Sequence, residues 1–375
     1  MVENNRIRRR ITRAALLCTL MLYVTIINPN KGVSQVGVSA KEIDPMVTKA
    51  IAFLKSKQEA DGSILPKAGG PGVTALAVAA LIRLNRADDL LVTKGLAYLE
   101  KNIQADGGIY NKRLANYSTC VALVAFKEAN KNGKYNQVIA NAVKFVKSLQ
   151  NSDESSSMFG GVGYDGKERP DLSNTQFFVE TLIQAGVDKN DPAITRALGF
   201  ISKCQNLPSE ANKLEFAKKA SADDKGGFVY NPAEANNPKS PNLTAEGGLR
   251  SAGVMGYAGL KSFLYAGVGK EDPRVKAAIA WIRAHYSLEE NPGQKDAGLY
   301  YYYHTFAKAM EVLNEEDFAD AKGNKHAWRK ELFETLKKKQ NENGSWVNSN
   351  RMFFENAPEL ATTFALLALS YCEKK

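Results

Sequence analysis

The phrase Gln340-Asn-Glu-Asn-Gly344-Ser-Trp346 and the apolar run Thr362-Thr-Phe-Ala-Leu-Leu-Ala-Leu369 that follows it decide the fold of this 375-residue chain. Apolar residues three and four positions apart precede the phrase, which predicts an amphipathic helix with one buried face. Its glycine can adopt the positive φ that ends a helix. The later run is apolar on all sides, so it predicts a second helix that protein surrounds. Together they predict one helical hairpin.

The same hairpin recurs along the chain. Similar phrases begin at Gln58, Gln104, Gln150 and Gln205, at spacings of 46, 46 and 55 residues, and a degenerate copy near Tyr286 precedes the last one. This is a repeat with loop insertions, and it predicts six hairpins. A small hydroxyl residue is expected near the start of each second helix, where it can bond exposed amides of the first turn. These residues are Thr74, Thr119, Thr175, Ser251, Thr305 and Thr362.

Alternating half-polar and fully apolar helices predict two concentric rings, with the apolar helices inside. An open stack of repeats would need polar capping repeats at its ends. Here the last helix is as apolar as the middle ones, which favours closure. The predicted fold is an all-α α/α toroid of six helical hairpins that occupies residues 41–375.

Residues 1–40 differ from the rest. Five arginines between Arg6 and Arg13 precede an apolar run from Ala14 to Ile27, and a polar stretch ends at Ala40. This pattern predicts a signal peptide, with retention as an N-terminal anchor as the alternative. The expected location is therefore periplasmic or extracellular, either free or anchored to the membrane.

Charge and cysteines narrow the function. Removal of residues 1–40 takes away six Lys/Arg and one acid, so the formal charge falls from +10 to +5. The lysines are scattered, which argues against nucleic-acid binding and leaves membrane-surface association open. The cysteines are too few and too widely spaced for a disulfide framework or a CxxC metal site. Cys120 and Cys372 lie in apolar runs and are expected to be buried.

The repeated phrase resembles the QW motif of squalene cyclases and protein prenyltransferase β-subunits. Residues 340–346 match it in full, and Gln104-Ala-Asp-Gly-Gly108-Ile-Tyr110 is a near copy with tyrosine. The resemblance covers about residues 43–372 and implies the α/α toroid. It also implies a structural role, in which the glutamine bonds free amides of a neighbouring helix end and the aromatic ring stacks against it. The residues given that role are Gln104, Tyr110, Gln340, Gly344 and Trp346.

The functional motifs of that family are incomplete here. The Asp-x-Asp-Asp acid motif of squalene–hopene type cyclases does not occur in the sequence. Tyr303-His304-Thr305 resembles the histidine segment of the prenyltransferase zinc site, but residues 249–254 lack the Asp-x-Cys pair that would complete it. The Cys-Gly-Glu-Gln segment of thioester domains is also missing. The sequence therefore predicts no cofactor and argues against zinc.

Functional groups are expected where the inner helices begin, because their N-termini converge on one end of the cavity. Asp171 and His304 are the candidate catalytic residues. Asp171 is equally explained as a helix-start residue, and His304 as a hydrogen-bonded pore residue. The insert 206–248 is predicted to lie across the cavity mouth. The candidate ligand-binding residues are Asn174, Phe178, Glu246, Arg250, Tyr257, Tyr302, Tyr303 and Glu359.

Three functions remain open from the sequence. The first is an exported terpenoid cyclase- or prenyltransferase-like protein that handles or binds an isoprenoid or other apolar ligand in a central cavity. The second is a carbohydrate-active toroid that uses paired carboxylates, with Asp171 and either Glu246 or Glu359 as the pair. The third is an interaction scaffold with a filled bore. The polarity of the cavity should separate them.

Overall fold

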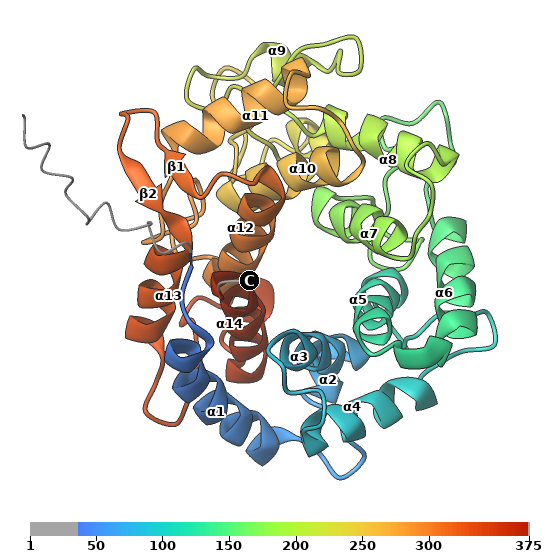
Figure 1. Cartoon of the computed structure of the whole chain (residues 1–375). Helices are drawn as coiled ribbons and strands as arrows, with labels where there is room; N and C mark the ends of the chain where they lie inside the picture. Colours follow the sequence, from blue (N-terminus) through green and yellow to red (C-terminus); the bar gives the residue numbers. More distant parts are fainter. Residues whose placement is uncertain (1–36, 374–375) are drawn as a thin grey trace, which may run out of the picture. The chain divides into compact units, whose positions relative to one another are not determined.

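The computed structural model describes residues 37–373, in which twelve long helices form two concentric rings (Figure 1). The inner ring consists of α3 (Pro71–Arg83), α5 (Ala115–Glu128), α7 (Leu172–Gln184), α10 (Gly253–Tyr265), α12 (Leu299–Leu313) and α14 (Pro358–Cys372). The outer ring consists of α1 (Ala40–Lys57), α4 (Leu90–Lys101), α6 (Asn136–Ser148), α8 (Pro192–Lys203), α11 (Pro273–Ala284) and α13 (Trp328–Lys339).

The ring is closed. Each inner helix packs against the next, and α14 packs against α3. The outer helices cover the inner ones, as α1 covers α14 and α13 covers α14 in Figure 1. Inner helices such as α3 and α14 are buried along nearly their whole length, because protein covers them on every side. The predicted α/α toroid is confirmed.

Short elements lie in the loops between the long helices. The helices α2 (Pro66–Gly69) and α9 (Glu215–Lys218) lie in loops, as do three 3₁₀ turns. The strands β1 (Asp317–Ala319) and β2 (Lys325–Ala327) form an antiparallel hairpin in which Phe318 pairs with His326. Cys120, Cys204 and Cys372 are buried free thiols, as expected for Cys120 and Cys372.

The threonines of the inner helices act differently from the expectation. The inner helices begin a few residues before them, for example α3 at Pro71 rather than near Thr74. Thr74 Oγ1 accepts a hydrogen bond from the backbone N–H of Ile64 at 2.9 Å. Ile64 lies in the turn that follows the outer helix. Thr119, Thr175 and Thr362 accept N–H groups at 2.9, 3.0 and 3.0 Å in the same way. Each of these four threonines therefore fixes the inner helix to the glycine turn of its own hairpin, whereas Thr305 donates to the carbonyl of Tyr301 on its own helix.

The repeated glutamines link neighbouring hairpins. Gln340 Nε2 donates to the carbonyl of Gly344 in its own turn and to that of Met46 in α1, both at 3.0 Å. Gln58, Gln150 and Gln205 reach carbonyls of α4, α8 and α11 in the same way, whereas Gln104 bonds only within its own turn. The expected partners of these glutamines are therefore wrong, because each side chain donates hydrogen bonds to backbone carbonyls instead of bonding free backbone amides.

The aromatic residues Tyr110 and Trp346 of these phrases pack beside the outer helices. Tyr110 stacks on Phe145 of α6, with ring centroids 5.5 Å apart. Trp346 is fully buried, and its indole N–H donates to the carbonyl of Leu336 at 2.8 Å. Both rings therefore pack the outer helices onto the hairpin turns.

Replacement of Gln340 by leucine should lower the free energy of unfolding by about 1–3 kcal/mol, because two buried carbonyls lose their donor. The measurement is urea unfolding, with Gln137→Leu at an exposed position of α6 as the control. Gln137 bonds only Asn141 on its own helix. Equal losses in the two variants would contradict a role of Gln340 in joining α13 to α1.

The N-terminal prediction falls mostly outside the described residues. Within them, Ser39 caps α1 through a capping box with Glu42, and the N–H of Val38 donates to the carbonyl of Cys372 at 2.9 Å. The signal peptide over residues 1–40 and its boundary stay predictions. Among residues 37–373, none of the helices has both the length and the apolar character that a membrane span requires.

Candidate functional site

A cavity of about 580 Å³ lies at the N-terminal end of the inner ring. Every inner helix contributes side chains from its first two turns or from the residue just before it, so the helix starts converge here as expected. Positive helix-dipole ends therefore surround the cavity. The contributing residues are Val73, Leu114, Tyr117, Ser173, Phe177, Ala252, Val254, Met255, Tyr301, Leu360 and Phe364.

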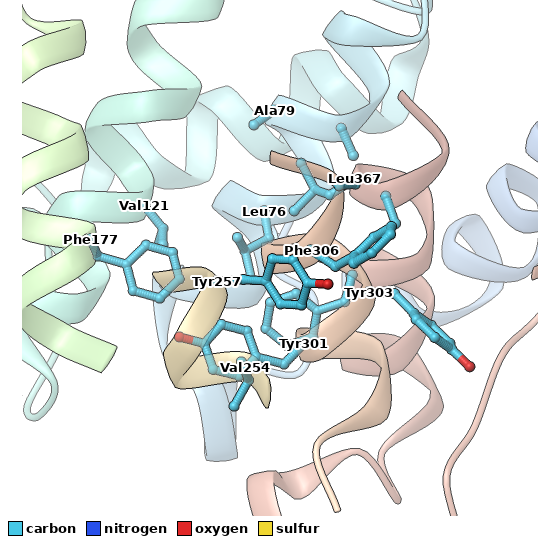
Figure 2. Packing of buried hydrophobic residues seen from close by; sticks show 14 of the residues in the cluster. Leu76, Ala79, Val121, Phe177, Val254, Tyr257, Tyr301, Tyr303, Phe306 and Leu367 are labelled. Carbon is cyan, nitrogen blue, oxygen red and sulfur yellow. The ribbon is translucent and has the colours of Figure 1, made fainter. Parts of the chain in front are cut away.

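Aromatic rings form the floor of the cavity. Phe177 of α7 stacks on Tyr301 of α12 with ring centroids 6.1 Å apart, and Figure 2 shows these two residues among the buried side chains of the inner helices. Tyr301 also contacts Phe364 at 5.4 Å, and Tyr117 meets Phe177 edge-on at 5.5 Å. Such rings offer a large apolar surface to a ligand.

The rim comes from the loops. Tyr230, Glu234 and Asn242 belong to the insert 206–248, which contributes to the mouth, and Arg250 follows it. Another part of the lining is the turn Met352–Phe354, which exposes two large apolar side chains, Met352 (57%) and Phe354 (71%). The mouth is therefore partly polar and partly apolar.

Asp171 begins α7 and is buried beside the cavity. Its carboxylate accepts the backbone N–H of Asn174 at 2.7 Å and the Asn174 side-chain amide at 2.8 Å. Burial raises the pKa of Asp171 to about 6, although hydrogen bonds from Asn174 and Tyr230 act in the opposite direction. The geometry is that of a helix N-cap, and the carboxyl lies next to Tyr164 and Tyr230, which line the cavity.

This pKa makes a pH prediction. Between about pH 4 and 6 the folded protein keeps a proton on Asp171 that the unfolded chain has released, so stability falls as pH rises through this window. Asp171→Asn keeps the capping oxygen and removes the titration. We expect the wild type to lose up to about 3 kcal/mol more than this variant from pH 4 to 6.5, measured by urea unfolding.

Burial also raises the pKa of Glu355 to about 6, so Glu355 changes the stability with pH in the same sense as Asp171. Its effect is the same in the wild type and in Asp171→Asn, so it cancels in the comparison. Its carboxylate accepts the N–H of Tyr301 at 2.8 Å, at the start of α12. Parallel pH profiles for the wild type and Asp171→Asn would show that Asp171 has an ordinary pKa.

Farther along the inner helices from the cavity lining, charged side chains of three helices meet. Glu180 of α7 accepts a hydrogen bond from the ammonium group of Lys261 of α10 at 2.7 Å and another from that of Lys308 of α12, and all three side chains are at most 3% exposed. Burial lowers the pKa of Lys308 to about 7, against the opposing effect of Glu180. The sequence interpretation missed this cluster, although charged residues inside apolar helices are a signal that could have found it.

A second pair extends the cluster to the remaining helices. Arg83 of α3 bonds Glu128 of α5 at 2.7 Å and the hydroxyl of Tyr371 of α14 at 2.5 Å.

His304 lies above the cluster, where it stacks on Phe364 at 5.9 Å and its Nδ1 atom has no hydrogen-bond partner among the described residues. Burial holds the pKa of His304 well below its usual value, so the imidazole is neutral.

Several other candidates do not line the cavity. Tyr302 and Tyr303 donate their hydroxyls to the carbonyls of Ser287 and Leu288, and Tyr257 packs against Phe306 at 5.0 Å. These corrections have one cause: only one face of each inner helix meets the axis. In the described part of the chain, the lining uses Tyr301 instead of its neighbours and Phe177 instead of the fully buried Phe178.

The candidate carboxylates are also dispersed. Glu246 is exposed in a turn of the insert, and Glu359 is half-buried in the first turn of α14, and neither residue lines the cavity. Of the candidate ligand-binding residues, Arg250 does line it, and its guanidinium donates to the carbonyl of Pro241 at 2.8 Å. Residues 37–373 contain no group of three acidic, histidine or cysteine side chains placed to hold a metal ion.

Comparison with known proteins identifies the repeats. Residues 65–220 match the family model of the squalene–hopene cyclase C-terminal domain. A type II terpene cyclase from Scytonema has the same fold, with a TM-score of 0.52, 13% identity and coverage of 89% of this chain and 98% of that one. Residues 65–220 are therefore squalene cyclase-like. Among curated proteins, none matches it by sequence.

The fold of this chain is also similar to that of an α-amylase and of a possible GH105 family member. An α-amylase from Clostridium perfringens matches with a TM-score of 0.54 at 12% identity, over 87% of this chain and 97% of that one. A possible member of the GH105 family from Salmonella enterica matches with a TM-score of 0.53 at 11% identity, over 89% and 94%. These likenesses establish the α/α toroid alone, so the function must be argued from the cavity.

Proposed function

We propose that this protein binds an isoprenoid or similar apolar small molecule in the cavity at the mouth of its inner ring. The observation that carries the proposal is the lining: aromatic and aliphatic side chains from six helices enclose about 580 Å³, a volume suited to a small ligand. The arginine-led apolar segment before residue 40 supports export, where the protein would meet lipid-derived ligands at a membrane surface.

Binding is proposed here without cyclisation. Type II cyclisation starts by protonation of an alkene, which requires a strong acid that faces the substrate. The two buried acids beside the cavity are both engaged, because Asp171 caps α7 through Asn174 and Glu355 accepts the backbone N–H of Tyr301. A role as ligand carrier therefore fits the cavity better than one as cyclase.

The test is calorimetric titration of the purified protein with farnesol. Wild type should bind, and Ala68→Trp should weaken binding at least about 10-fold, because Ala68 lies exposed on α2 at the lining and tryptophan would fill the mouth. Ala321→Trp, an equal change at an exposed alanine outside the lining, is the control. Absence of farnesol binding by the wild type, or equal binding by both variants, would refute the proposal.

One observation favours the carbohydrate-active alternative, which requires paired carboxylates: Glu168 and Glu234 both line the cavity. Glu234 is already engaged by Ser240 at 3.0 Å and Asn242 at 2.7 Å. Release of reducing sugar from starch, together with its loss in Glu234→Gln, would favour this alternative over apolar-ligand binding.

A further inference from the structure

The floor of the cavity carries two hydroxyl groups in contact. Ser173 Oγ and the Tyr301 hydroxyl lie 2.8 Å apart, and both residues line the cavity. The Tyr301 oxygen also accepts an N–H of Gln176 at 3.3 Å. The two hydroxyls have two protons, and their mutual contact uses one. Within residues 37–373, neither hydroxyl has another acceptor among the hydrogen bonds found, so one proton is left for an occupant of the cavity.

Positive charge lies directly behind this pair. Gln176 Oε1 accepts a hydrogen bond from the ammonium group of Lys261. The Lys261 nitrogen also lies 5.9 Å from the centroid of the Phe177 ring. Lys261 and Lys308 share the single carboxylate of Glu180. Arg83 and Glu128 form a balanced pair farther along the bore. The floor is therefore backed by two lysines that share one carboxylate, an arrangement that attracts an anion while both lysines are protonated.

The two observations define one end of the ligand. A purely hydrocarbon ligand would cover the leftover hydroxyl and leave it without an acceptor, at a cost in affinity. A cationic end would be repelled by the two lysines behind the floor. A carboxylate supplies the missing acceptor and the opposite charge, and hydrogen bonds to an ionised group are the stronger kind.

We propose, on the basis of the apolar-ligand function above, that the ligand ends in a carboxylate that accepts a hydrogen bond from the Ser173–Tyr301 pair. The apolar remainder of the ligand lies along Phe177, Phe364 and Val254 toward the mouth. Ser173 and Tyr301 thus select the head group, and the rings select an apolar chain.

The experiment compares three probes that share one chain: farnesoic acid, farnesol and farnesene. Wild type should bind the acid at least about 10-fold more tightly than farnesene, with farnesol between them. The double variant Ser173→Ala/Tyr301→Phe removes both hydroxyls and should lose most of that preference while keeping its affinity for farnesene. Tyr257→Phe removes a buried hydroxyl outside the lining, so it should keep the preference. Thermal unfolding checks that all three proteins are folded.

Each result decides a different point. Equal affinities for the three probes, or an acid preference that survives in the double variant, would overturn the carboxylate proposal and leave apolar binding intact. Failure of all three probes to bind the wild type would refute apolar binding in the cavity, and the head-group proposal with it.

Discussion

Glu180→Gln should destabilise this protein by at least about 3 kcal/mol, because it removes the counter-charge that two buried lysines share. Lys261 and Lys308 come from different helices, and Glu180 is their common partner in the middle of the bore. Burial already lowers the pKa of Lys308 to about 7, so we expect this lysine to lose its proton in the variant. Urea unfolding at pH 7 measures the loss.

The matched control is Lys308→Met. It removes one ammonium and leaves Glu180 paired with Lys261, so its charges balance. Replacement of a buried charge by an apolar side chain of similar length is often close to neutral, and we expect a change of about 1 kcal/mol or less. A loss in Glu180→Gln no larger than that in Lys308→Met would show that the shared carboxylate does not hold the inner helices together.

Gly344→Ala should lower the free energy of unfolding by at least about 3 kcal/mol. Gly344 has a φ of +86°, and a Cβ atom there would lie 2.3 Å from the backbone oxygen of Lys49 in α1. The backbone of α1 cannot move away easily, because α1 also packs against α14. The variant should therefore open the ring between its last and first outer helices, which hydrogen exchange in α1 would detect.

Gly323→Ala separates conformation from contact. Gly323 has nearly the same φ, +84°, but a Cβ there meets no atom within 4 Å. Only the left-handed backbone is penalised, so we expect a loss of about 1–2 kcal/mol. If the two alanine variants lose equal stability, close packing of the turn on α1 contributes nothing, and ring closure depends on other contacts.

The sequence predicted the ring because its evidence is periodic and local. Apolar spacing in the outer helices, apolar character on all sides of the inner helices and a glycine after each outer helix are properties of neighbouring residues. The repeat of the Gln340–Trp346 phrase then fixed the number of hairpins, and the squalene cyclase resemblance agreed with them.

The sequence predicted where the cavity lies, at the starts of the inner helices, but not which side chains line it. The convergence of helix starts located the cavity, yet which residues of an inner helix face the axis could not be determined. A helix that is apolar all round gives no signal of its orientation, so Tyr301 could not be told from Tyr302, nor Phe177 from Phe178. The charged residues Glu180, Lys261 and Lys308 did carry a signal, but their meeting depends on three helices far apart in sequence.

The sequence by itself determined the hairpins, their order and the burial of one helix in each pair, because these follow from the spacing of apolar residues and glycines. The tertiary structure alone decided the rotation of each inner helix about its own axis. That rotation places Ser173 against Tyr301 and Glu180 between two lysines, because each contact joins side chains that only ring closure brings within hydrogen-bonding distance.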